Sequence, residues 1–225
     1  MIPLLILRPE RGAIATAKRA TALGLSPMVR SLFKVEPRAW DAPDPALFDS
    51  LLLTSANAVR YGGGAVGLYR ALPVFAVGAA TAQAARDAGF ETVIEGTGNA
   101  ADTLRALAKT GQSRPLHLSG EDRTPYPHLP FTVTTRIVYE ATAMDTELPT
   151  GRYAALLHSA RAATRFADLC PSPKLVDVVS ISAAVTDAAG PGWRTVVTAD
   201  KPTDDAMLAL AAMLCDGQTM RHGQE

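Results

Sequence analysis

An internal repeat constrains the fold of this chain more than any other feature of its sequence. The segment SLLLTSA at 50–56 returns as AALLHSA at 154–160. The shift of 104 positions that carries Leu52 onto Leu156 also aligns later parts of the two copies. Because this period is far too long for a solenoid, we expect two domains of one architecture. The matched blocks are 50–58 with 154–162, 74–85 with 178–189 and, after a slip of one residue, 90–107 with 193–210.

Length and composition agree with two soluble domains. The 225 residues are enough for two domains of about 100 residues each. Hydrophobic residues make up 48% of the chain and charged residues 20%, which argues against long disorder. The net charge is zero and no basic stripe is present, so nucleic-acid binding is disfavoured. No apolar run approaches the roughly 20 residues of a membrane span, and we expect a cytoplasmic protein.

Short apolar runs alternate with helix-forming segments in both copies. This alternation is typical of α/β domains with parallel sheets. Tyr153 to Leu214 is expected to repeat the element order of the first copy. The expected strands are 2–7, 50–53, 74–77, 92–95, 116–118 and 132–139, with 26–35 extended, and the expected helices are 13–23, 57–69, 81–88 and 100–109, the last capped by Asn99 or Asp102.

The opening strand and helix have no partner within the first copy. We therefore expect them to complete the domain formed by the second copy, which makes that domain discontinuous. The predicted fold is two similar parallel-sheet α/β domains, joined by a two-stranded extended linker, with a cleft between them. The predicted boundaries are 1–31 plus 146–225 for the discontinuous domain, 39–138 for the inserted domain, and 32–38 and 139–145 for the linker strands.

Ligands of parallel α/β sheets bind outside the carboxyl ends of the strands, where loops lead into helix N-termini. Free amides and the macrodipole attract anions there, at about 0.3–1 kcal/mol for an exposed carboxylate. The alternative to ligand binding is a structural role, in which the Ser and Thr residues in these loops are ordinary N-caps. The candidate substrate-binding residues in the repeated loops are Thr54, Ser55, Gly78, Thr81, Ser119, Gly120, Ser159, Ser182 and Ala183.

Motifs typical of dinucleotide sites, metal sites and hydrolases do not indicate any of these functions here. GGGAVG at 62–67 fits GxGxxG but follows a helix-like segment, so a dinucleotide site is not expected there. The four histidines lack metal-ligand spacing, and no GxSxG elbow surrounds Ser55 or Ser159. We interpret Asp204 and Asp205 as acids in the first turn of a helix.

The two cysteines give no redox signal, because Cys170 and Cys215 stand far apart and belong to no CxxC pair. Tyr139 is a stronger functional candidate. It closes an alternating strand at the start of a predicted link, where its hydroxyl would donate a proton to a leaving group. A structural tyrosine at a domain seam is the alternative.

These segments together resemble the uroporphyrinogen-III synthase family over nearly the whole chain. The segments that carry the resemblance are LILRPERG, LLLTSANAV, VFAVGAATAQAARDAGF, LHLSGEDR, VYEA, LLHSARAATRF and TADKPTDDAMLALA. The resemblance implies cyclisation of hydroxymethylbilane to uroporphyrinogen III, with inversion of ring D and loss of water, without a cofactor or metal. It also implies a linear tetrapyrrole substrate, a monomer, and transient hand-over of that substrate from hydroxymethylbilane synthase.

The resemblance assigns roles to individual residues. Tyr139 matches the family's tyrosine that assists the leaving group, and Arg8 matches the arginine after the first strand. Two departures stand out: Ser182 to Val185 replaces a Gly-Pro-Thr-Thr loop, and TPYPHLP at 124–130 replaces a full helix. The alternatives to catalysis are a noncatalytic two-lobed protein that binds or senses a small anion, and a scaffold that keeps only the fold.

Overall fold

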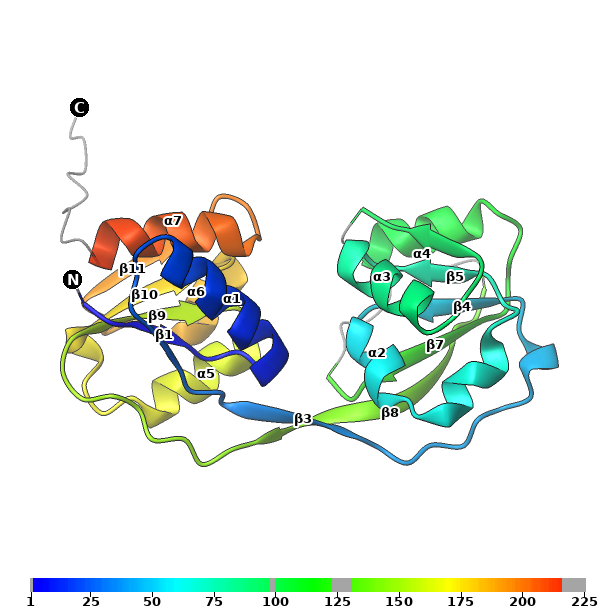
Figure 1. Cartoon of the computed structure of the whole chain (residues 1–225), viewed down its shortest axis with the longest axis horizontal. Coiled ribbons are helices and arrows are strands. Elements are labelled where there is room, and N and C mark those ends of the chain that lie inside the picture. The colour runs from blue at the N-terminus through cyan, green and yellow to red at the C-terminus, as the bar shows by residue number, and fades with distance from the viewer. Residues whose placement is uncertain (1, 98–99, 123–130, 216–225) are drawn as a thin grey trace. The chain divides into compact units, whose positions relative to one another are not determined.

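The computed structural model describes residues 2–97, 100–122 and 131–215. The chain forms two compact units, a discontinuous unit of residues 1–34 and 143–225 and an inserted unit of residues 35–142 (Figure 1). Each unit is built on one sheet, and the pairs of strands within both sheets are parallel except at β3. The α/β class predicted from the repeat is therefore confirmed.

The sheet of the discontinuous unit has the order β11-β10-β9-β1-β2. Its strands are β1 (Leu4–Ile6), β2 (Pro27–Val29), β9 (Tyr153–Leu157), β10 (Val176–Ser180) and β11 (Thr195–Thr198). Its helices are α1 (Glu10–Ala22), α5 (Ala160–Leu169), α6 (Ala183–Ala189) and α7 (Asp204–Cys215), with a 3-10 turn at Pro173–Leu175. Helices α1 and α7 pack on one face through an apolar cluster that includes Leu4, Ile6 and Leu208, and α5 lies on the other (Figure 1).

The sheet of the inserted unit has the order β3-β8-β7-β4-β5-β6. Its strands are β3 (Phe33–Pro37), β4 (Ser50–Leu53), β5 (Val74–Ala76), β6 (Val93–Glu95), β7 (Pro115–Gly120) and β8 (Thr134–Ala143). Its helices are α2 (Ala56–Tyr61), α3 (Ala79–Asp87) and α4 (Ala100–Ala108), with 3-10 segments η1 (Pro45–Leu47) and η2 (Gly64–Tyr69).

The apolar run of β4 is buried on both faces of its sheet. Leu51 and Leu53 join the cluster under α2 and α3, while Leu52 packs with Leu104 and Leu107 of α4. Successive strand residues point to opposite faces, so a strand between two helical layers must be apolar throughout. This requirement explains why both copies of the repeat carry an unbroken apolar run.

The two sheets share one strand arrangement with a different chain order. Strands β4, β5 and β6 correspond to β9, β10 and β11, and the next two positions are filled by β7 and β8 in one sheet and by β1 and β2 in the other. The repeat predicted this correspondence for the three shared strands. The edge strand β3 runs antiparallel to β8, because Arg38 donates to Val138 and Met144 to Leu32.

Two predicted elements differ from the structure. The helix expected at 57–69 is interrupted: α2 ends at Tyr61, and Gly63 has a φ of 71°, which an α-helix does not accommodate. The rest of the segment is the 3-10 helix η2. The strand expected at 132–139 instead runs to Ala143, so Tyr139 lies within β8 and does not close it.

Some predictions lie outside the described residues. They concern the cap at Asn99, the proline-rich segment at 124–130, and the polar tail at 216–225. In the described part of the chain, no helix combines the length and apolar character that a membrane crossing requires. Across the same residues, no cluster of three or more His, Cys, Asp or Glu side chains could hold a metal ion.

Candidate functional site

In the inserted unit, the ring of Tyr139 lies directly over Gly120 at the carboxyl end of β7. A Cβ at position 120 would stand 2.6 Å from two ring carbons of Tyr139 and 2.9 Å from its hydroxyl oxygen. These separations are far below van der Waals contact, so only glycine allows the ring this position. The ring of Tyr61 lies alongside, with centroids 6.4 Å apart. Tyr139 is therefore held at the edge of the sheet where ligands of α/β folds bind.

A shift in strand register aims Tyr139 at this position. Ser119 pairs with Ile137, but Gly120 pairs with Tyr139, so Val138 is skipped in the pairing of β8 with β7. Val138 is fully buried in the cluster under α2 and α3, and Tyr139 packs against the same cluster. Two consecutive residues of a regular strand point to opposite faces, and a bulge removes that alternation. The backbone amide of Glu121 donates to the Tyr139 carbonyl at 3.1 Å and fixes the shifted pair.

Further polar groups line the same edge of the inserted unit. The Thr54 hydroxyl lies 2.9 Å from Nε2 of the buried His117. Ser55 caps α2 by accepting from the Asn57 amide at 3.2 Å, and the Ser119 hydroxyl donates to the Gly120 carbonyl at 3.0 Å. The N-cap alternative therefore describes Ser55 correctly, although a capping hydroxyl keeps its own proton to donate to a ligand.

The loop after β5 places Gly78 and Thr81 at the start of α3. Gly78 has a φ of 84°, a conformation that L side chains rarely adopt, which lets the chain turn directly from strand into helix. The side chain of Thr81 is only 5% exposed, so the open groups at this helix start are backbone amides.

The corresponding loops of the discontinuous unit also lead into helix starts. Ser159 caps α5 by accepting from the Ala162 amide at 3.2 Å. Ser182 is the N-cap of α6 without a side-chain bond, and Ala183 is exposed in its first turn. Behind this loop, the Thr186 hydroxyl bonds to Ser180 and, at 2.8 Å, to Thr198. Hydroxyl groups therefore remain at this loop, although they come from other positions than in a Gly-Pro-Thr-Thr sequence.

Asp204 is the centre of a polar cluster that the sequence interpretation missed. Its carboxylate accepts from Nη1 of Arg8 at 2.9 Å and from the Thr16 hydroxyl at 2.5 Å. Arg19 forms a further ion pair with it, and Nε2 of His158 lies 2.9 Å from its Oδ1. Asp204 does lie in the first turn of α7, as predicted, but its side chain is only 8% exposed. It joins α7 to α1, to the end of β9 and to the loop after β1.

The environment of Asp204 keeps its carboxyl ionised. Burial alone would raise the pKa of Asp204, but hydrogen bonds from His158 and Thr16 and the charge of Arg8 outweigh burial and hold that pKa well below its ordinary value. Among the described residues, Nδ1 of His158 is buried without a hydrogen-bond partner. We therefore assign the ring proton to Nε2, which donates to Asp204.

Arg8 keeps its place in this cluster because the facing residue of α1 is glycine. A Cβ at Gly12 would stand 2.5 Å from Nε of Arg8 and 2.9 Å from its guanidinium carbon. Arg8, His158 and Asp204 each follow a strand of one sheet, and this common position is the signal that would have revealed the cluster. Predicting this cluster from the sequence requires the order of the strands in the sheet, and one sequence alone does not reveal that order.

The glycine-rich segment at 62–67 takes no part in either group of loops. It begins at the end of α2 and continues into η2, whereas a dinucleotide-binding loop connects a strand to the start of a helix.

Comparison with known proteins shows the family to which this fold and these residues belong. The uroporphyrinogen-III synthetase from Helicobacter pylori 26695 matches with a TM-score of 0.67 at 16% identity, covering 95% of this chain and 100% of that chain. A mutant uroporphyrinogen III synthase from the extremely thermophilic bacterium Thermus thermophilus gives 0.50 at 17% identity, covering 95% and 99%. A comparison with curated protein sequences finds no match. The family model described as Uroporphyrinogen-III synthase HemD matches residues 14–209.

The chain belongs to the uroporphyrinogen-III synthase family. The two similar structures are only 16% and 17% identical to this chain in sequence, so they show a shared two-domain fold and no more. Because Tyr139 packs on Gly120, a substitution of Gly120 tests whether the position of the Tyr139 ring matters for the activity of this member of the uroporphyrinogen-III synthase family.

We expect Gly120→Ala to lower kcat about fivefold, because the added methyl group must push the Tyr139 ring away from the edge of the sheet. Steady-state rates of uroporphyrinogen-III synthase activity measure this effect, with thermal unfolding followed in parallel. Gly64→Ala is the matched control, since a Cβ there meets no atom within 4 Å. Equal rates for the two variants would show that the position of the ring is irrelevant.

Proposed function

We propose that this chain cyclises hydroxymethylbilane to uroporphyrinogen III, with inversion of ring D and loss of water. Membership of the uroporphyrinogen-III synthase family supports the substrate and the product. The observation that carries the proposal is the placement of Tyr139, whose ring is held over Gly120 at the carboxyl end of β7.

In the proposed reaction, the pyrrole nitrogen of the substrate expels the hydroxymethyl oxygen. Tyr139 donates the proton that this oxygen needs to leave as water, and the resulting cation is an azafulvene. The substituted carbon of ring D then attacks and forms a spiro-pyrrolenine, which fragments and recloses with ring D inverted. When the chain recloses, a proton lost from the unsubstituted α-carbon of ring D balances the proton given to the leaving oxygen.

The substrate carries eight carboxylates, and the loops of both units offer groups that bind them. Backbone amides at helix starts and capping hydroxyls suit carboxylates because they donate hydrogen bonds without adding a mobile charge. Arg8 adds a guanidinium whose Nη1 is fixed by Asp204. The proposed substrate-binding residues are Arg8, Thr54, Ser55, Gly78, Thr81, Ser119, Gly120, Ser159, Ser182 and Ala183.

We also propose that the protein acts as a cytoplasmic monomer and takes its substrate directly from hydroxymethylbilane synthase. A reactive linear tetrapyrrole closes spontaneously, so a short transfer would limit formation of the wrong isomer. The proposal concerns only the delivery of substrate and leaves the chemistry of the site unchanged.

Isomer analysis of the product tests the proposed reaction. Purified protein mixed with freshly generated hydroxymethylbilane is expected to yield the type III isomer faster than the type I isomer forms in buffer alone. The products are oxidised to porphyrins and separated by chromatography. If the protein binds hydroxymethylbilane but only the type I isomer forms, at the spontaneous rate, the result would instead favour a noncatalytic binding protein.

A further inference from the structure

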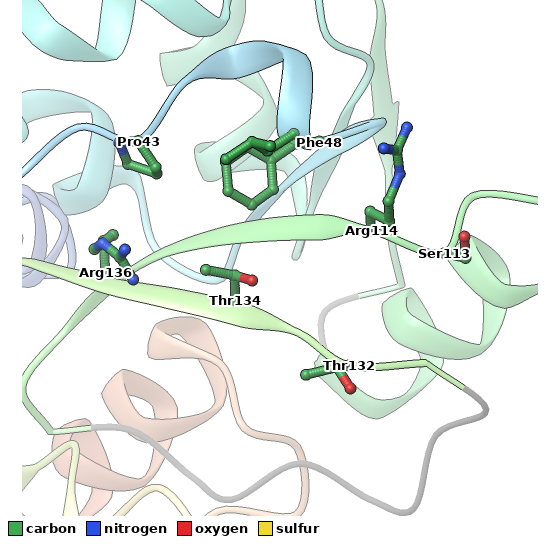
Figure 2. Close-up of a pocket in the computed structure, with 8 residues that line it drawn as sticks. Pro43, Phe48, Ser113, Arg114, Thr132, Thr134 and Arg136 are labelled. Carbon is green, nitrogen blue, oxygen red and sulfur yellow. The ribbon is translucent and has the colours of Figure 1, made fainter.

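A cavity of about 480 Å³ opens on the inserted unit at the amino ends of its strands (Figure 2). Its rim includes Arg114, which directly precedes β7, and Thr134, the first residue of β8. Tyr139 lies further along β8, at the carboxyl end of β7, three residues beyond the lining residue Arg136, which is about 10 Å at about 3.3 Å per residue. The cavity is therefore separate from the candidate reaction site.

One wall of the cavity is a polar row at the start of β8. Thr132, Thr134 and Arg136 all line the cavity, and alternate residues of an extended chain share one face. In the described part of the chain, the Arg136 guanidinium donates to two backbone carbonyls, those of Asp41 at 3.3 Å and Thr135 at 3.1 Å. These neutral acceptors orient the guanidinium and leave its positive charge for a ligand.

A second wall is the turn that carries Ser113 and Arg114. The carboxylate of Asp49 accepts from the backbone amides of both residues, at 2.8 Å and 3.0 Å, and holds the turn in place. The Arg114 side chain is 61% exposed, and its Nε is 3.8 Å from the same carboxylate. This loose ion pair leaves most of the guanidinium exposed at one end of the cavity.

The third wall is apolar and rigid. It consists of Leu47, which is 58% exposed, and of Phe48 and Pro43, which Figure 2 labels. The Tyr69 hydroxyl donates to the Pro43 carbonyl at 2.8 Å, and burial raises the pKa of Tyr69, which keeps that proton in place. The Asp44 side chain caps the turn before Leu47 by accepting from the Ala46 amide at 3.0 Å.

We propose that this cavity binds a small organic anion with one carboxylate or phosphate group and an apolar body. The lining residues include three hydroxyls and two guanidinium groups, which lie at opposite ends of the cavity (Figure 2), and none of the lining residues is acidic. Apolar and polar residues line the same cavity, so a ligand that combines both characters can contact both. The volume lies in the usual range for small-molecule sites. This site is independent of the proposed cyclisation.

Titrations followed by amide NMR test the site on the full chain. Phenyl phosphate and phenylacetate serve as amphiphilic probes, and inorganic phosphate tests the anionic group alone. Phenyl phosphate is expected to shift the amide signals of 44–48, 113–114 and 132–136 and to bind more tightly than inorganic phosphate. A stronger response to phenylacetate would identify a carboxylate as the preferred group, whereas no response of these signals to either amphiphilic probe would overturn the proposal.

Variants separate the two halves of the ligand. One of the two variants Arg136→Gln and Arg114→Gln is expected to weaken phenyl phosphate about tenfold, and that variant identifies the end of the cavity that holds the phosphate. Leu47→Ala is expected to weaken phenyl phosphate and to leave inorganic phosphate unchanged. Arg105→Gln, at an exposed arginine of α4 outside the lining, is the matched control. If the affinity of Arg114→Gln and of Arg136→Gln equals that of this control, no arginine site exists here.

Discussion

Replacing Asp204 with alanine is expected to lower the free energy of unfolding of the discontinuous unit by about 3–5 kcal/mol. The buried carboxylate accepts from Arg8 and Thr16 and pairs with Arg19 and His158. Removing it leaves cationic and polar donors facing one another without an acceptor, which costs more than the pair contributes when intact.

Chemical denaturation measures this loss unit by unit. Trp193 stacks on Phe166 in the discontinuous unit, with ring centroids 5.1 Å apart, so its fluorescence in a Trp40→Phe background reports that unit. Asp205→Ala is the matched control, because Asp205 is 81% exposed and pairs with Arg19 at the surface. Its expected effect is within about 0.5 kcal/mol. A shared denaturation midpoint for the two variants would contradict the central role of Asp204.

The stability that Asp204 contributes depends on pH, and the direction of that dependence follows from its pKa. The folded structure lowers the pKa of Asp204 below its ordinary value. Its contribution is therefore complete above the unfolded-state pKa of about 3.9 and is lost as the pH falls from there toward the folded-state pKa. The difference in stability between the native chain and Asp204→Ala is expected to be larger at pH 6 than at pH 3.

Replacing Tyr139 with phenylalanine is expected to lower kcat for cyclisation by about tenfold to a hundredfold. A positioned proton donor contributes about this much or more, and the substrate's own nitrogen supplies part of the driving force here. The substitution keeps the ring on Gly120, so thermal stability should stay close to that of the native chain. Single-turnover rates with hydroxymethylbilane separate the chemical step from substrate binding.

Tyr61→Phe is the informative comparison, because the two tyrosine rings are neighbours with centroids 6.4 Å apart. Both variants remove one hydroxyl from the same edge of the inserted unit. A loss of rate in Tyr139→Phe alone supports the assignment of the proton donor. A loss in Tyr61→Phe alone would move the donor to that residue.

The fold class could be read from the sequence because it depends on local pattern and on repetition. The apolar run at 50–53 must lie between two helical layers, and its copy at 153–157 must do the same. Ser55 and Ser159 follow these strands and cap the next helices, as their residue type predicts. Each of these features is encoded within a few residues of chain.

The interrupted helix after α2 shows the limit of local pattern. The segment SANAVRY favours helix, yet Gly62 and Gly63 allow a turn, and the packing of η2 decides between the two. The buried Tyr69 and Val66 of η2 join the main cluster of the inserted unit, which a continued helix would have placed elsewhere. Packing of distant side chains therefore overrides the propensity of this segment.

Taken alone, the sequence determined the duplication, the α/β class and the loops in which candidate groups lie, because spacing along the chain encodes all three. Only the tertiary structure decided which groups meet. Asp204 finds Arg8 196 positions away, and Tyr139 rests on Gly120 through a shift in strand register. Such contacts depend on strand order and side-chain packing, which arise only when segments remote in the chain come together.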